Sequence, residues 1–179
     1  MAKAWLTRPG RMTVRSSIMP VLTRVRLFAM DVDGVLTDGG MYYSESGDEL
    51  KKFNTRDGMG IKLLQRAGLI TALITMEETK LVMRRAEKLA IPEVHQGARD
   101  KLAVLRALAA RHGLTLEEMA YIGDDVNDLE ALKAVGFSAA PADAMPSVLE
   151  VVTYICRKSG GEGAVREVAD LILEAKAKR

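Results

Sequence analysis

The 179-residue sequence is poor in cysteine, histidine and aromatic residues, with one cysteine, two histidines and 4% aromatic residues. A single cysteine forms no internal disulfide, which predicts a reducing, cytoplasmic location, and Cys156 is interpreted as a small buried apolar residue. The two histidines, His95 and His112, do not have the spacing of metal ligands. The sequence has no apolar run near the roughly 20 residues of a membrane span, and its net charge is only +2. We therefore expect a globular protein with neither a membrane nor a nucleic acid as partner.

The most informative segment is 31–39, which directly follows the apolar run 25–30. This run is typical of a buried parallel strand, and open α/β sheets bind ligands at the carboxyl ends of such strands. Asp31 and Asp33 come at that point, and Gly34 lets the chain turn away. Two such carboxylates can hold Mg²⁺ and place a nucleophile beside a general acid, as phosphoryl transfer through an aspartyl-phosphate requires. An acidic turn after a strand is the alternative interpretation.

Three later segments add polar side chains that suit the same chemistry. Thr75 ends a second apolar run, where its hydroxyl could hydrogen-bond a phosphoryl oxygen. Lys101 begins a helical run, which is an unfavourable place for a cation unless the helix end faces a phosphate. Carboxylates gathered after a third strand are costly unless a cation neutralises them. This third group comprises Asp124, Asp125 and Asp128.

These features, in this order, resemble the four motifs of the haloacid dehalogenase superfamily of phosphatases, and the resemblance covers about residues 25–175. It implies that Asp31 is the nucleophile and that Asp33 is first the general acid and then the general base. It also implies a Mg²⁺ cofactor. The implied ligands are Asp31, the backbone carbonyl of Asp33, and Asp124.

The remaining motif residues receive supporting roles from the same resemblance. Thr75 and Lys101 would bind the oxygens of the transferring phosphoryl group. Asp128 would orient the site, through Lys101. Asp125 is either a metal ligand or a helix cap, and the sequence leaves both roles open.

The order of elements predicts a doubly wound α/β fold with a mostly parallel sheet, which is the Rossmann-like fold of the superfamily. Residues 1–22 contain basic residues but no acid, and we expect a disordered basic tail there, followed by a single domain over 23–179. Strands are expected at 25–30, 70–75, 93–95, 119–122, 137–139 and 151–155, and helices at 58–67, 78–89, 100–112, 126–135 and 162–176.

Residues 41–53 predict a β-hairpin, with Gly47 in its turn. In this superfamily larger cap domains are inserted after the first motif or between the second and the third. Too few residues lie between Thr75 and Lys101 to hold a domain. The resemblance therefore implies a capless homotetramer, in which the hairpins join in a central barrel and a neighbour's C-terminal segment covers each site. Packing of the hairpin on its own domain is the alternative.

A closer resemblance is to the 3-deoxy-ulosonate phosphate phosphatases, and it is carried by 31–39, 53–58, 96–97 and 160–163. Members that act on an eight-carbon acid usually have Thr-Gly-Arg at the second motif, whereas this sequence continues from Thr75 with Met76 and Glu77. The sequence is similar here to the 2-keto-3-deoxynononate 9-phosphate phosphatases, in which Thr-Gly-Glu precedes a basic helix. The expected substrate is therefore a phosphorylated sugar acid, with nine carbons favoured over eight.

By this resemblance Glu77 would accept hydrogen bonds from sugar hydroxyls. Arg85, Lys88 and Lys158 would meet the substrate carboxylate. The helical rise separates Glu77 from Lys88 by roughly 16 Å, which favours a site shared between subunits. A solvated basic helix face is the alternative interpretation. Two further substrate-binding candidates, Asn54 and Asp57, would line the cleft or cap the following helix.

Two classes of function remain. The first is a Mg²⁺-dependent phosphatase of a sugar-acid phosphate, or of a different phosphate ester. The second is a non-catalytic module, similar to the phosphatase-like domains attached to some nucleotidyl-sugar synthetases. The complete set of motif residues favours the enzyme. A phosphomutase is disfavoured because it needs a cap to retain its intermediate.

Overall fold

The computed structural model describes residues 10–47 and 49–177, and its centre is one parallel sheet of six strands. The strand order is β5-β4-β1-β6-β7-β8. The chain thus builds one half of the sheet outward from β1 and then the other half from β6. Ligands bind at the reversal point of such sheets, here between β1 and β6. The strands are β1 (Leu27–Met30), β4 (Ile70–Ile74), β5 (Glu93–His95), β6 (Met119–Ile122), β7 (Phe137–Ala140) and β8 (Tyr154–Ile155).

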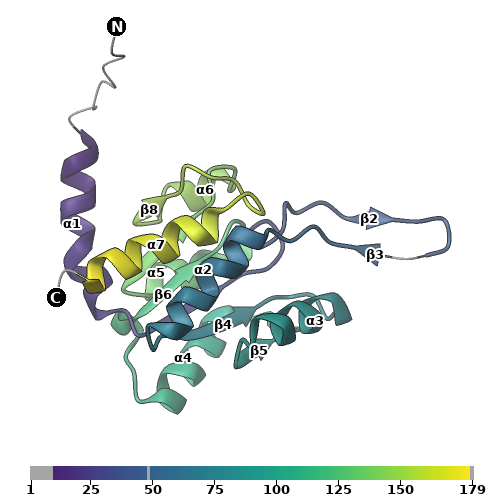
Figure 1. The fold of residues 1–179 in the computed structure, drawn as a ribbon, viewed down its shortest axis with the longest axis horizontal. Helices are drawn as coiled ribbons and strands as arrows, with labels where there is room; N and C mark the ends of the chain where they lie inside the picture. The colour runs from purple at the N-terminus through teal and green to yellow at the C-terminus, as the bar shows by residue number, and fades with distance from the viewer. Residues whose placement is uncertain (1–9, 48, 178–179) are drawn as a thin grey trace, which may run out of the picture.

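Helices cover both faces of the sheet, as Figure 1 shows. Alternate residues of β1 supply the two cores: Phe28 faces one helix layer and Ala29 faces the other. The predicted doubly wound α/β fold is confirmed. One layer holds α1 (Gly10–Arg24), α2 (Thr55–Arg66), α3 (Lys80–Leu89) and α7 (Ala164–Ala177), and the other holds α4 (Lys101–His112), α5 (Leu129–Ala134) and α6 (Pro146–Leu149).

The predicted hairpin is formed by β2 (Tyr42–Tyr43) and β3 (Glu49–Leu50), which pair antiparallel. It extends away from the sheet rather than lying on it (Figure 1). An isolated bridge between Thr37 and Phe53 closes its root. The side chains of its strands are therefore solvent-facing, with Tyr43 69% exposed and Leu50 61% exposed.

The disordered tail expected over 1–22 differs from the structure, in which α1 is helical from Gly10. Ile18 and Leu22 are buried in the core that also holds α7. Their spacing of four residues puts both on one helix face, and this short apolar stripe holds the helix to the domain. The domain boundary predicted at residue 22 thus falls inside a helix, and residues 1–9 lie outside the described part of the chain.

Two smaller differences concern short helices. Two 3-10 turns, η1 (Leu116–Glu118) and η2 (Val126–Asp128), precede β6 and α5. The one-turn helix α6 was not expected, because four residues carry no helical periodicity. Among the described residues, no helix is both long enough and apolar enough to cross a membrane.

Candidate active site

The loop after β1 carries Asp31 to the reversal point of the sheet. The backbone N–H of Asp31 donates to the carbonyl of Ile122 at 3.0 Å, so the loop is tied to β6. Gly34 has a φ of +80°, and a Cβ added there would lie 2.0 Å from Oδ2 of Asp124. Only glycine therefore fits at position 34, where the first acidic loop contacts the one after β6.

Lys101 is buried between the carboxylates of Asp31 and Asp128. Its Nζ lies 2.9 Å from Oδ2 of Asp31 and 2.6 Å from Oδ1 of Asp128. Burial lowers the pKa of Lys101, but the two carboxylates outweigh this effect and leave it raised. Burial and then the charge of Asp128 hold the pKa of Asp31 well above its usual value, although Lys101 opposes both. The residues of three motifs thus form one connected ionic cluster.

Asp128 has hydrogen-bond partners on both of its oxygens. Oδ2 accepts from the backbone N–H groups of Asp124, at 3.0 Å, and Asp125, at 3.3 Å. Oδ1, besides Lys101, accepts from the hydroxyl of Tyr121 at 2.6 Å. This arrangement makes Asp128 an anchor for the loop and for Lys101 rather than a free ligand. The sequence analysis did not identify Tyr121. Strand alternation places its side chain on one face of the sheet, but the sequence alone does not say on which face Asp128 lies.

Asp125 is placed as a helix cap. Its Oδ1 accepts the backbone N–H of Val126 at 2.6 Å, at the start of η2. Of the two roles that the sequence left open, the structure therefore shows the capping contact.

The acidic cluster suits a divalent cation. Oxygens of Asp31, Asp124 and Asp128 lie within 4.8 Å of one another. Oδ1 of Asp124 is buried without a hydrogen-bond partner. Burial and the charge of Asp128 raise the pKa of Asp124 to about 7. A buried carboxylate oxygen without a partner is what a bound cation would satisfy, and Mg²⁺ prefers oxygen ligands. Because Asp128 is engaged elsewhere, Asp31 and Asp124 are the carboxylates that fit this role.

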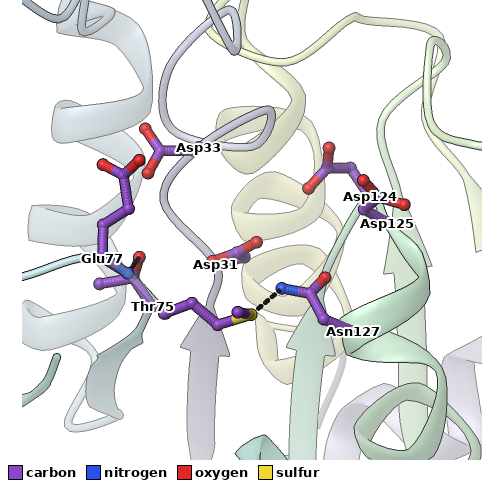
Figure 2. Close-up of a pocket in the computed structure, with 8 residues that line it drawn as sticks. Asp31, Asp33, Thr75, Glu77, Asp124, Asp125 and Asn127 are labelled. Atoms are coloured by element: carbon purple, nitrogen blue, oxygen red, sulfur yellow. Dashed lines mark hydrogen bonds between the residues drawn. The ribbon is translucent and has the colours of Figure 1, made fainter. Parts of the chain in front are cut away.

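A pocket of about 270 Å³ opens above Asp31. Figure 2 shows Asp31 in the middle, with Asp33 and Glu77 on one side and Asp124 and Asp125 on the other. The dashed line in Figure 2 is a hydrogen bond of 3.1 Å from the amide of Asn127 to the sulfur of Met76. The lining residues are Asp31, Asp33, Thr75, Met76, Glu77, Asp124, Asp125 and Asn127.

Lys51, at the root of the hairpin, reaches the rim of this pocket. Its Nζ lies 2.7 Å from Oδ1 of Asp33 and also pairs with Glu77. Burial acts to lower the pKa of Lys51. The hydrogen bonds to Asp33 and Glu77, together with their charges, outweigh burial, so the pKa is raised overall. The sequence analysis did not identify this residue. Lys51 and Lys52 follow β3 in extended chain, where neighbouring side chains point to opposite sides, but alternation does not say which of the two turns inward.

Asn54 and Asp57 both make structural contacts outside the pocket lining. The Oδ1 of Asn54 accepts from the backbone N–H of Arg56 at 2.8 Å, so α2 begins three residues before the predicted position 58. The Nδ2 of Asn54 donates to the carbonyl of Gly161 at 3.0 Å. Asp57 is fully buried and accepts the backbone N–H of Arg166, in the first turn of α7, at 2.8 Å. Of the roles foreseen for the two residues, Asn54 performs the helix cap, whereas Asp57 holds α7.

Arg85, Lys88 and Lys158 also lie outside the lining of the pocket in their own chain. The guanidinium of Arg85 donates to the carbonyl of Asn54 at 2.8 Å and lies over the ring of Phe53 at 5.4 Å. Lys88 and Lys158 are exposed. The structure therefore does not bring these cations together with Glu77 within one chain.

The glycine-rich segment 160–163 packs on the first acidic loop. The N–H of Gly161 donates to the carbonyl of Val35 at 3.0 Å. A Cβ added to Gly160 would lie 1.9 Å from the carbonyl oxygen of Gly34. The C-terminal part of the domain thus supports the loop that carries Asp31.

The model of the haloacid dehalogenase-like hydrolase family matches residues 71–168. This chain belongs to that family. The expected superfamily membership is therefore confirmed, and the chain is a hydrolase. The residues expected for the third and fourth motifs, Lys101 and Asp124 to Asp128, lie within the matched range.

Named relatives of this hydrolase cover nearly its whole length. The 3-deoxy-D-manno-octulosonate 8-phosphate phosphatase of Yersinia pestis is 44% identical over 165 residues, which are 92% of this chain and 88% of the relative. The enzyme of the same name from Escherichia coli K12 is 41% identical over the same shares. The crystal structure of the Moraxella catarrhalis enzyme, in complex with magnesium, phosphate and KDO, is 42% identical. It superposes with a TM-score of 0.89 over 91% of this chain and 94% of that one.

Proposed function

We propose that this hydrolase is a Mg²⁺-dependent phosphatase that cleaves a 3-deoxy-ulosonate phosphate through an aspartyl-phosphate intermediate. The observation that carries the proposal is the placement of Asp31 at the reversal point of the sheet, where it contacts Lys101 and belongs to the same acidic cluster as Asp124, which has an unpartnered oxygen. A carboxylate in such a place is positioned as a nucleophile beside a cation site. The names of the relatives support the reaction class.

The proposed reaction has two displacements. A carboxylate oxygen of Asp31 attacks phosphorus, the ester P–O bond breaks, and Asp33 donates a proton to the departing alkoxide. Asp33 then takes a proton from a water molecule, whose oxygen attacks phosphorus and releases both phosphate and Asp31. Lys101 and Thr75 would bind phosphoryl oxygens. Asp31, Asp124 and the backbone carbonyl of Asp33 would hold Mg²⁺, which would offset the negative charge of the phosphoryl group.

Two sugar acids compete as the substrate. The named relatives act on an eight-carbon 8-phosphate. The nine-carbon preference rests on the resemblance at the second motif, by which Glu77 would accept hydrogen bonds from sugar hydroxyls. Because Lys51 already pairs with Glu77 and the named relatives take an eight-carbon ester, we favour the eight-carbon acid. The nine-carbon preference stays a prediction, and a paired assay decides between the two.

We expect phosphate release from both acids to require Mg²⁺, with a higher kcat/KM for the eight-carbon ester. The physical reason is the acidic cluster, which leaves Asp124 without a partner unless a cation is bound. The measurement is phosphate release with Mg²⁺, with EDTA and after Mg²⁺ is restored. A higher kcat/KM for the nine-carbon ester would instead support Glu77 as an acceptor of sugar hydroxyls. Turnover of neither ester would overturn the substrate class and favour another phosphate ester or the non-catalytic module.

We further infer that the chain assembles as a homotetramer through its hairpins. The hairpin projects from the domain and exposes apolar side chains, among them Tyr43 and Leu50 (Figure 1). Exposed apolar patches of this kind mark protein interaction sites. The pocket of each chain is not lined by its own Arg85, Lys88 or Lys158. In the tetramer, a neighbouring chain could supply these residues to it.

The double substitution Tyr43→Asp and Leu50→Asp should convert the tetramer into monomers, because it places eight new carboxylates, two from each chain, where the hairpins meet. Light scattering should give about four times 19.5 kDa for the original chain and about 19.5 kDa for the variant. Val151→Asp, at a 37% exposed position between α6 and β8, is the matched control and should leave the mass unchanged. A monomeric original chain would contradict the assembly and remove the shared site.

A cytoplasmic location remains our inference from the cysteine content. Cys156 is the sole cysteine of the sequence and is buried as a free thiol. Burial raises its pKa, which makes the reactive thiolate scarce. This environment agrees with the interpretation of Cys156 as an apolar core residue.

A further inference from the structure

The side chain of Lys51 is fully covered, unlike that of its neighbour Lys52, which is 52% exposed. Its ammonium lies among three carboxylates: Asp33 at 2.7 Å, Glu77, and Glu49 at 4.0 Å. A lysine that leaves water needs such partners to offset its lost hydration.

Lys51 is the main contact of the Asp33 carboxyl group. Oδ1 of Asp33 accepts from Lys51 at 2.7 Å and more distantly from the hydroxyl of Thr37 at 3.5 Å. Oδ2 is buried and has no hydrogen-bond partner. One oxygen is therefore fixed by the hairpin, and the other, in a residue that lines the pocket, makes no hydrogen bond.

We propose that Lys51 is a positioning residue that fixes the carboxyl group of Asp33 for proton transfer to the leaving group, and so ties the hairpin to the acid–base step. The inference rests on the role of Asp33 in the proposed function. A general acid acts only within hydrogen-bond reach of the atom that it protonates. Without Lys51 the carboxyl group of Asp33 is free to rotate, and Glu77 adds an unpaired negative charge beside it.

The test compares two leaving groups in the variant Lys51→Met, which keeps most of the length of the side chain and removes its charge. A sugar alkoxide needs a proton to depart, whereas p-nitrophenolate leaves without one. We expect kcat/KM for the sugar-acid phosphate to fall about 30-fold, and that for p-nitrophenyl phosphate by less than about threefold, since general acid catalysis contributes about 10²–10⁴-fold. A loss of folding would lower both values alike and leave their ratio unchanged. A loss of assembly would remove the neighbour's cations from the sugar-acid site alone, so the comparison counts only if light scattering shows that the variant keeps the mass of the original chain.

Two further variants sharpen the test. Lys52→Met makes the same change one residue along the hairpin, where the lysine pairs with Glu162 at 2.5 Å, and should leave the ratio at its original value. Lys51→Arg keeps a cation beside Asp33. It should restore most of the kcat/KM for the sugar-acid phosphate, relative to that for p-nitrophenyl phosphate, that Lys51→Met loses. Circular dichroism and light scattering on all variants report folding and assembly.

Equal losses for both substrates, or no change in either, would overturn the role of Lys51. This failure is distinct from a failure of the proposed substrate. If the original chain releases no phosphate from either ulosonate ester, the substrate class is wrong. The same ratio measured with any other alkyl phosphate that the chain hydrolyses then still decides whether Lys51 positions Asp33.

Discussion

Replacing Asp31 by asparagine should lower kcat by at least about 10⁴-fold, as expected for the loss of a nucleophile. The carboxamide keeps the size of the side chain and can still accept a hydrogen bond from Lys101, now 2.9 Å from Oδ2 of Asp31. It cannot form the acyl-phosphate. Removal of one charge from the buried acidic cluster also relieves the repulsion between Asp31 and Asp128, so the fold should persist.

The measurement is phosphate release at saturating Mg²⁺, with circular dichroism and light scattering on the same preparations. Asp38→Asn makes the same chemical change further along the same loop, where the side chain contacts Gly40 and Tyr42. This control should retain activity within about threefold, as for a surface substitution remote from the reacting atoms. Turnover near the original level in a clean preparation of Asp31→Asn would refute the covalent mechanism.

Replacing Lys101 by methionine should destabilise the domain by about 3–5 kcal/mol, because it strands two buried carboxylates without their cation. Lys101 is 2% exposed and contacts both Asp31 and Asp128. The side chain of Asp128 is fully covered, so water cannot replace the lost charge. Turnover should fall as well, since the same ammonium contacts Asp31, the proposed nucleophile, and would bind the phosphoryl group.

Urea unfolding in the presence of EDTA gives the stability change without a contribution from bound metal. Lys133→Met is the matched control, because Lys133 is 51% exposed and pairs with the exposed Glu130 at 3.0 Å. Its loss should cost less than about 0.5 kcal/mol. A cost below about 1 kcal/mol for Lys101→Met would mean that the buried cluster relaxes or takes up protons instead.

The centre of the site could be foreseen because its geometry follows from a parallel sheet. Asp31, Thr75 and Asp124 each follow a strand, and the carboxyl ends of parallel strands meet at one edge. Lys101 joins them because its helix starts beside that same edge. These contacts depend on the order of elements and on local apolar runs, which the sequence displays directly.

The periphery of the site depends on contacts between distant segments that local patterns do not encode. Asp57 meets the first turn of α7, which lies 109 residues later in the chain. Lys51 meets Glu77 across the hairpin and the loop after β4. The helical stretch before Arg24 was missed because its buried face consists of only a few apolar residues, among them Ile18 and Leu22. Each miss thus concerns packing partners rather than local propensity.

The contact between Gly160 and Gly34 has a consequence for synthesis on the ribosome. The loop that carries Asp31 is made early, but β6 and the segment 160–163, which hold it in place, are made much later. A nascent chain therefore carries Asp31 without the segments that orient its loop until residues 160–163 have been made. Because a domain folds as a unit once its elements have emerged, hydrolysis should begin only after the segment 160–163 has left the exit tunnel.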